Sequence, residues 1–161
     1  MKKLVDKEKI PEFISNVDKL TAGERADLRR CAGKRYSEAT GNAIAAFMKS
    51  LPREVPEYME DIWFATLCFR CIWKDEKGNI PFEEALRLLE GNGIEKRFIS
   101  LLDEDWNDDS LINIKLYRLM KQLHQNGQKP DFELFLRDLM SWNNTERYVQ
   151  KRWARRYFKE V

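Results

Sequence analysis

The fold is decided by residues 57–73, which read EYMEDIWFATLCFRCIW. Wound as a helix, this stretch carries apolar side chains over most of its circumference, which is typical of a helix that is buried on nearly every side. Pro52 and Pro56 precede it, and proline is tolerated at the first turn of a helix but not inside one. The sequence therefore predicts a central helix with the rest of the chain packed around it.

Helical patterns continue on both sides of this stretch. Within residues 7–20, apolar side chains recur at the i, i+3, i+4, i+7 spacing of one helical face. Thr21 and Glu24 have the spacing of a capping box, which predicts a helix over residues 22–32. Ser110, Asp131 and either Asn144 or Thr145 are expected to cap the last three helices. Beyond those already named, helices are predicted over residues 37–51, 82–89, 94–102, 111–125 and 132–142, with a last one ending at Phe158.

No stretch of the sequence has the alternation of a convincing strand. We therefore expect an all-α fold, a compact helical bundle of about eight to nine helices. The acidic turn at residues 103–109 is the best place for a boundary between two small lobes. On that reading residues 1–105 form the N-terminal lobe and residues 106–161 the C-terminal lobe, and a single domain is the alternative.

Composition limits the class of protein. The chain has 161 residues, of which 43% are hydrophobic and 35% charged, and this balance excludes collagen-like, low-complexity and disordered chains. The longest uncharged apolar-rich stretch, residues 62–69, is far shorter than the roughly 20 residues of a membrane helix. Three cysteines are too few for a disulfide framework. We expect a protein of the cytoplasm without a membrane partner.

The net charge of +2 hides an uneven distribution. Residues 1–50 carry 11 Lys or Arg against 7 Asp or Glu, residues 51–109 carry 7 against 15, and residues 110–161 carry 11 against 5, which gives +4, −8 and +6. Basic ends around an acidic middle predict a strongly uneven surface field, unless the two signs pair with each other in the fold.

The sequence contains few residues in patterns that suit catalysis or metal binding. His124 is the only histidine, so neither a His-based triad nor a multi-His metal site can form. Cys68 and Cys71 have the spacing of a zinc or redox half-site, but they lie in the most apolar helix without a second pair, which favours buried structural thiols. The acidic residues 103–109 lack the glycine and the terminal glutamate of a calcium loop. We expect no metal, no cofactor and no enzymatic activity.

Basic clusters are the features that indicate a function. The first lies at the end of the helix over residues 22–32 and in the loop after it, where Leu28 and Cys31 are expected to turn inward. Guanidinium groups suit phosphate oxygens well. The expected contacts of this cluster are Arg29, Arg30, Lys34 and Arg35, and single cations at Arg97, Lys115, Arg118 and Lys121 are expected to extend the same surface.

The second cluster is the last helix. At 100° per residue one half of it is basic and a narrower stripe is apolar. The basic half holds Arg147, Lys151, Arg152, Arg155, Arg156 and Lys159, and the stripe holds Val149, Trp153 and Tyr157. Such a helix can dock by its apolar stripe and present its cations to a polyanion, with Tyr148 as a stacking group. An ordinary terminal helix whose cations pair with the acidic middle is the alternative, and the narrow apolar stripe disfavours a membrane-surface helix.

The order of these segments resembles the small subunit of the type I-E CRISPR Cascade complex, the CasB family. The segments that carry the resemblance are residues 25–30 (RADLRR), 63–69, 82–89, 95–98 (EKRF), 111–123, 131–142 and 152–158 (RWARRYF). The resemblance covers roughly residues 20–158 and rests on order and spacing, since none of these segments is a catalytic signature. The sequence differs from the family pattern at residues 80–84 (IPFEE), and residues 1–19 carry no feature that matches the family.

The resemblance implies an all-helical protein without enzymatic activity that assembles as a pair in the complex, beside other Cascade subunits. It further implies contacts with the CRISPR guide RNA and the target DNA backbone, including the displaced strand of the R-loop. By position, the implied contacts are Arg29, Arg30, Arg97, Arg118, Arg147 and Arg152. A protein that serves any guide must bind backbone rather than base edges, and dispersed Arg and Lys on helical faces do so.

Three rival functions remain open at this point. A helical adaptor that binds only protein would show no salt-dependent binding to single strands. A helix-turn-helix regulator, built from residues 22–51, would leave a sequence-specific footprint on duplex DNA. A carboxylate-dependent hydrolase would cleave nucleic acid in the presence of a metal.

Overall fold

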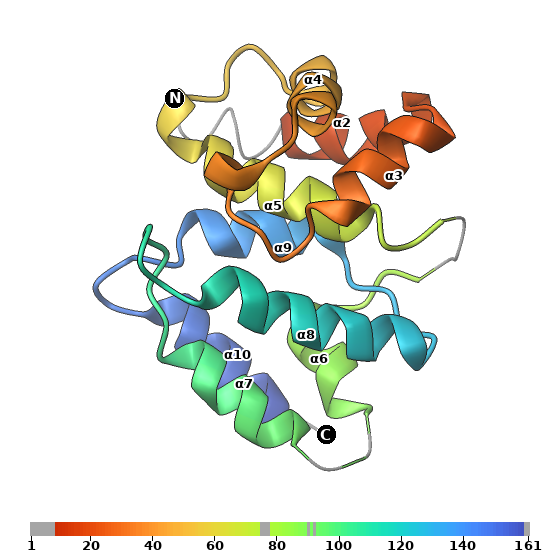
Figure 1. Cartoon of the computed structure of the whole chain (residues 1–161). Coiled ribbons are helices and arrows are strands. Elements are labelled where there is room, and N and C mark those ends of the chain that lie inside the picture. Colours follow the sequence, from red (N-terminus) through yellow and green to blue (C-terminus); the bar gives the residue numbers. More distant parts are fainter. Residues whose placement is uncertain (1–8, 75–77, 90, 92, 160–161) are drawn as a thin grey trace.

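A computed structural model of the chain describes residues 9–74, 78–89, 91 and 93–159 (Figure 1). The first two positions of the helix expected over residues 7–20 lie outside these ranges. Within them the prediction of an all-α bundle of eight to nine helices is confirmed, with nine α-helices and three short 3-10 helices. In chain order they are α2 (Ile10–Ser15), η2 (Asn16–Lys19), α3 (Ala22–Arg30), η3 (Tyr36–Glu38), α4 (Gly41–Ser50), η4 (Glu57–Met59), α5 (Glu60–Arg70), α6 (Phe82–Arg87), α7 (Ile94–Leu102), α8 (Ile112–Gln125), α9 (Phe132–Met140) and α10 (Tyr148–Phe158).

Helix α5 lies at the centre, as its sequence predicts. Figure 1 shows α2, α3 and α4 on one side of it and α6, α7, α8 and α10 on the other, while α9 packs against α5 and α2. Every residue of α5 from Trp63 to Arg70 is buried. Its rings meet those of its neighbours, with centroid distances of 4.9 Å from Trp63 to Phe13 and 5.3 Å from Phe64 to Phe47. Each such side chain contributes about 1.5–3 kcal/mol by leaving water, which makes α5 the main organiser of the core.

The predicted helix starts are confirmed where a side chain caps the helix. The Thr21 hydroxyl accepts a hydrogen bond from the Glu24 amide at 3.1 Å, and the Glu24 carboxylate accepts one from the Thr21 amide at 2.9 Å. The Asp131 carboxylate accepts one from the Leu134 amide at 3.1 Å. These bonds satisfy amides that the first turn of a helix leaves unpaired, so α3 and α9 begin where the sequence places them.

Several helix starts differ from their predictions. Ser110 does not cap α8, whose N-cap residue is Leu111, and α5 begins at Glu60 after the 3-10 helix η4. Helix α4 begins at Gly41 rather than near residue 37, because the Thr40 hydroxyl accepts the Ala43 amide and caps it there. Helix α10 begins only after Arg147, whose backbone is left-handed with φ 54°, so neither Asn144 nor Thr145 is its cap. The Asn144 side chain instead accepts the Glu146 amide at 2.8 Å and stabilises the turn before the helix.

Residues from both sides of position 105 share the hydrophobic core. The buried apolar side chains form one cluster that runs from α2 to α10. The Phe98 ring of α7 stacks on that of Tyr157 in α10 at 4.5 Å, and the Phe69 ring of α5 meets that of Phe135 in α9 at 6.3 Å. The division at residue 105 stays a prediction. None of the helices described is long and apolar enough to cross a membrane.

Candidate nucleic-acid interface

The first basic cluster lies at the end of α3. Leu28 and Cys31 are buried there, while Arg29 and Arg30 are exposed, as the sequence predicts. Arg30 forms an exposed ion pair with Asp27 at 2.6 Å. Arg29 forms no ion pair with any residue that the structure describes. The guanidinium of Arg29 is therefore available to a ligand at the helix end.

The loop that follows α3 lies directly on α8. Gly33 has a left-handed backbone with φ 87°, and a Cβ there would stand 2.9 Å from the Cβ and Cγ of Tyr117. The Asn113 side chain donates a hydrogen bond to the Lys34 carbonyl at 3.0 Å. Only glycine permits this backbone to approach so closely. The loop thus carries Lys34 and Arg35 to the side of α8.

This packing brings Arg29 of α3 and Lys121 of α8 to the same recess, beside Tyr117. The Lys121 ammonium lies over the Tyr117 ring, 5.4 Å from its centroid, which is cation–π distance. We call the surface formed here the α3–α8 surface, and it comprises Arg29, Arg30, Lys34, Arg35, Tyr117 and Lys121. Sequence reasoning missed Tyr117, because only the fold reveals that a ring at this position lies between two predicted cations.

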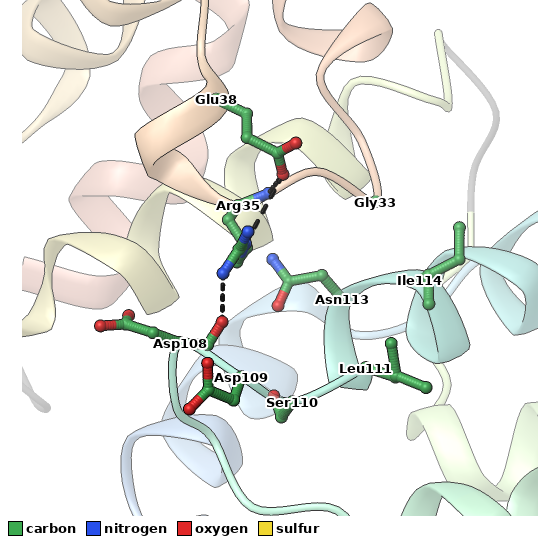
Figure 2. A pocket seen from close by; sticks show the side chains of 9 residues that line it. All are labelled: Gly33, Arg35, Glu38, Asp108, Asp109, Ser110, Leu111, Asn113 and Ile114. Carbon is green, nitrogen blue, oxygen red and sulfur yellow. Dashed lines mark hydrogen bonds and ion pairs between the residues drawn. The ribbon is translucent and has the colours of Figure 1, made fainter.

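Arg35 lies at the edge of this surface, in a hollow of mixed charge between the loop and the start of α8 (Figure 2). Its guanidinium donates to the Asp108 carbonyl and stands 3.7 Å from the Glu38 carboxylate. Asp109 also lines the hollow. Because carboxylates surround Arg35, this hollow is a weaker anion site than the recess at Arg29 and Lys121.

Four predicted cations lie exposed on helices away from the recess. Arg118 points outward from α8, about 100° around the helix from Tyr117. Arg97 on α7 and both Lys151 and Arg155 on α10 are also exposed. No residue in the described ranges forms an ion pair with any of the four.

Arg152 of α10 is only partly exposed, whereas the helical pattern places it among the exposed cations. It pairs with the Asp138 carboxylate of α9, whose side chain is only 5% exposed. The same carboxylate accepts a hydrogen bond from the Trp153 indole at 2.8 Å. A buried carboxylate is costly unless it is paired, so the fold holds the guanidinium of Arg152 against Asp138.

Arg156 lies one turn further along α10 and has a similar role. Its guanidinium contacts the Glu83 carboxylate of α6 at 3.0 Å, and the Glu83 side chain is 1% exposed. Burial raises the pKa of Glu83, although the hydrogen bond from Arg156 acts in the opposite direction. Two buried carboxylates on two other helices therefore tie α10 to the core. Sequence reasoning missed Glu83 and Asp138 as partners, because only the fold brings α6 and α9 against α10.

Arg147 is also engaged within the protein. Its guanidinium donates to the Leu102 carbonyl at the end of α7. Half-buried Arg147 thus connects the start of α10 to α7. Tyr148, next to it, remains exposed as the sequence predicts for a stacking group.

The thiol groups are buried, as the sequence predicts, and the imidazole lies at the surface. Cys31, Cys68 and Cys71 are buried free thiols. Burial raises the pKa of Cys71 to about 12, against smaller lowering effects of nearby arginines, so its thiol stays protonated. His124 is exposed late in α8 and meets the Trp73 ring edge-on at 5.2 Å. Among the residues that the structure describes, no three His, Cys, Asp or Glu side chains are grouped to hold a metal ion.

The fold and this surface define a class, namely small all-α proteins that expose cations on helical faces and hold other cations in buried ion pairs. The chain belongs to the family described as CRISPR-associated protein Cse2, whose sequence pattern matches residues 24–158. This match confirms the resemblance to the CasB family. A curated relative, the CRISPR-associated protein Cse2 of Thermus thermophilus, is 30% identical over 89 residues. That match covers 55% of this chain and 42% of the relative, so it spans less than half of the relative's length.

Solved structures share the fold over nearly the whole chain. The Cse2-family protein of Thermus thermophilus superposes with a TM-score of 0.76 at 22% identity, covering 94% of this chain and 96% of that one. The CasB protein of M. ruber superposes with a TM-score of 0.71 at 18% identity, covering 92% of each chain. A chain of a structure described as a CRISPR RNA-guided surveillance complex superposes with a TM-score of 0.73 at 19% identity, covering 98% of this chain and 94% of that one.

Proposed function

We propose that this chain is a non-catalytic subunit of a CRISPR RNA-guided surveillance complex of the Cascade type and binds nucleic acid through the α3–α8 surface. In that role it contacts the sugar-phosphate backbone of the guide RNA and the target DNA, and it stabilises the displaced strand of the R-loop. Its protein partners are the other subunits of the complex and a second copy of itself. The complex acts in the cytoplasm.

The observation that carries the proposal is the meeting of Arg29 and Lys121 at one recess, from helices far apart in the sequence. Neither cation has a carboxylate partner among the described residues. Lys34 adds an exposed charge on the loop after α3, whose backbone is fixed to α8 by the Asn113 hydrogen bond. Cations without internal partners gain most from phosphate, because no ion pair has to be broken first. The match to the Cse2 family and the likeness to a chain of a CRISPR RNA-guided surveillance complex support a place for this surface beside nucleic acid.

The exposed cations elsewhere have a supporting role in this proposal. Arg97, Arg118, Lys151 and Arg155 extend the positive field along α7, α8 and α10. Arg147, Arg152 and Arg156 contribute by fixing α10, since their guanidinium groups have partners inside the protein. Backbone contacts spread over several helices suit a subunit that must accept every guide sequence.

The test compares two double variants in the reconstituted complex. Arg29→Ala with Lys121→Ala removes two predicted phosphate contacts. Arg53→Ala with Arg137→Ala removes the same charge at exposed positions outside the predicted clusters. Target-DNA binding is measured from low to high salt. Each lost contact with a single strand should lower the slope of log affinity against log salt by about 0.7, so the first pair should lower it by about 1.4.

The control pair should leave the slope unchanged, and both pairs should leave subunit assembly intact. An unchanged slope in the Arg29 and Lys121 variant, with normal assembly, would instead favour the helical adaptor that binds only protein. Metal-dependent cleavage of the target by the isolated chain would contradict the non-catalytic role.

A further inference from the structure

The recess between the end of α3 and α8 differs in charge from three other recesses of the described surface. It is lined by Arg29, Ile72, Tyr117, Lys121, His124 and Gln125, none of which is acidic. Each of these three recesses contains at least two carboxylates. They belong to Glu38, Asp108 and Asp109 in the first, to Glu12 and Glu24 in the second, and to Asp18 and Glu133 in the third. The recess at Arg29 and Lys121 therefore favours an anionic ligand, whereas the carboxylates of the other three recesses repel one.

The size of the recess limits what can enter. Its volume is about 250 Å³. Pockets for whole small molecules occupy about 300–1,000 Å³, so this recess suits part of a larger ligand, such as one base of a nucleic-acid strand.

The ring of Tyr117 is held in place within the recess. Gly33 packs against its Cβ, Cγ and Cδ2 atoms, so the loop after α3 supports one part of the ring. The Lys121 ammonium lies over the ring on a flexible stem. A flat ligand can therefore take the place of the ammonium on the ring, while the ammonium moves to a neighbouring phosphate. Arg29 provides a second cationic contact for phosphate, a guanidinium from the other helix.

We propose that this recess holds one unstacked nucleotide of a single strand, with its base on Tyr117 and its phosphates between Arg29 and Lys121. The inference rests on the proposed function and specifies that the nucleic acid bound at this recess is single-stranded. A base in a duplex is paired and stacked on both faces, so it cannot reach Tyr117 without leaving the helix. An unpaired strand offers its bases freely, and aromatic side chains bind them with little regard to sequence.

The test uses the full chain and strands of 12 nucleotides, labelled for fluorescence anisotropy. Each strand is offered as DNA, as RNA, as a duplex and as a DNA strand of abasic deoxyriboses, which keeps the phosphates but has no bases. The variant is Tyr117→Leu, which retains an apolar side chain against Gly33. The control is Tyr58→Leu in η4, which removes an exposed ring outside the recess and outside the basic clusters. Circular dichroism verifies that both variants are folded.

The wild-type chain should bind the DNA strand at least about fivefold more tightly than its abasic counterpart. Tyr117→Leu should lose this fivefold preference for the ordinary DNA strand over the abasic strand. Its affinity for the abasic strand should equal that of the wild type. The Tyr58→Leu variant should retain this fivefold preference, and duplex affinity should be the same in all three proteins. The DNA and RNA arms identify which single strand fits better.

Equal wild-type affinity for the ordinary and the abasic strand would overturn the inference, and this comparison needs no variant to fold. A Tyr117→Leu protein that still prefers the ordinary strand would overturn it as well. In both cases salt-dependent binding would persist, and the proposed function would stand. Absence of salt-dependent binding to any strand, both by the chain and by the complex, would contradict the proposed function itself.

Discussion

The α3–α8 surface and helix α10 contain the same kinds of basic side chain, yet the fold uses them in opposite ways. On the α3–α8 surface, Arg29 and Lys121 face a recess without a carboxylate. On α10, Arg152 and Arg156 face Asp138 and Glu83, both almost fully buried. The difference teaches that a cation's role depends on what lies opposite its charged group, which the residue type alone does not reveal.

The contrast has an energetic basis. A buried carboxylate loses its hydration, and only a well-placed partner offsets that loss. Removing the partner leaves a buried charge, so a change on α10 should affect stability. An exposed cation is already hydrated, so a change on the α3–α8 surface should affect binding and leave stability nearly unchanged.

The largest effect should come from Arg152→Ala, which leaves Asp138 with only the Trp153 indole as its hydrogen-bond donor from α10. Breaking a fully buried ion pair costs about 3–5 kcal/mol. The Arg152 side chain is 34% exposed, so we expect the free energy of unfolding to fall by about 2–3 kcal/mol. Urea denaturation followed by circular dichroism measures this change.

The matched control for that variant is Arg155→Ala, which removes an exposed arginine from the same helix. Its free energy of unfolding should remain within about 0.5 kcal/mol of the wild type. Equal losses in the two variants would show that α10 is not held by the buried pair, and the comparison between the two regions would fail.

A smaller effect is expected at Gly33, where the α3–α8 surface depends on a close backbone approach. Gly33→Ala adds the strain of a left-handed backbone, about 1–3 kcal/mol, and sets a methyl group against Tyr117. Gly127→Ala has similar backbone strain, with φ 73°, but open space around its Cβ. Gly33→Ala should therefore be the less stable of the two, and thermal unfolding of both variants measures the gap.

The same pair of variants tests how the surface is built. Only Gly33→Ala should also weaken binding to single strands, since it displaces the loop that carries Lys34 onto α8. Similar stability and similar binding in the two alanine variants would mean that contact with Tyr117 does not position the loop.

The fold was largely predictable from the sequence because its signals are local. The capping box at Thr21 and Glu24 and the apolar stretch at residues 63–69 depend on neighbours within one helix, and both are found where expected. The recess and the buried pairs depend on contacts between helices. A helical wheel of α10 places Arg152 among the basic residues, but it cannot show that Asp138 of α9 lies opposite.

Two carboxylates in unlike surroundings, Glu83 and Glu104, should give pH profiles of stability with opposite sign. Burial raises the pKa of Glu83 above its ordinary value of 4.5, so the folded chain binds this proton more tightly than the unfolded chain. The contribution of Glu83 to stability is therefore greatest below pH 4.5 and falls as the pH rises from 4.5 through the raised pKa. A Glu83→Gln variant should lose this decline, which for one proton is at most about 1.4 kcal/mol per pH unit.

Glu104 is the matched control, since its hydrogen bond with Lys115 lowers its pKa below 4.5. Its contribution is present above 4.5 and falls as the pH drops through the lowered pKa, so Glu104→Gln should alter the profile only on the acid side. Urea titrations between pH 3 and 7 measure both slopes, and a Glu83→Gln profile parallel to that of the wild type above pH 4.5 would mean that α10 is not anchored through a costly buried carboxylate.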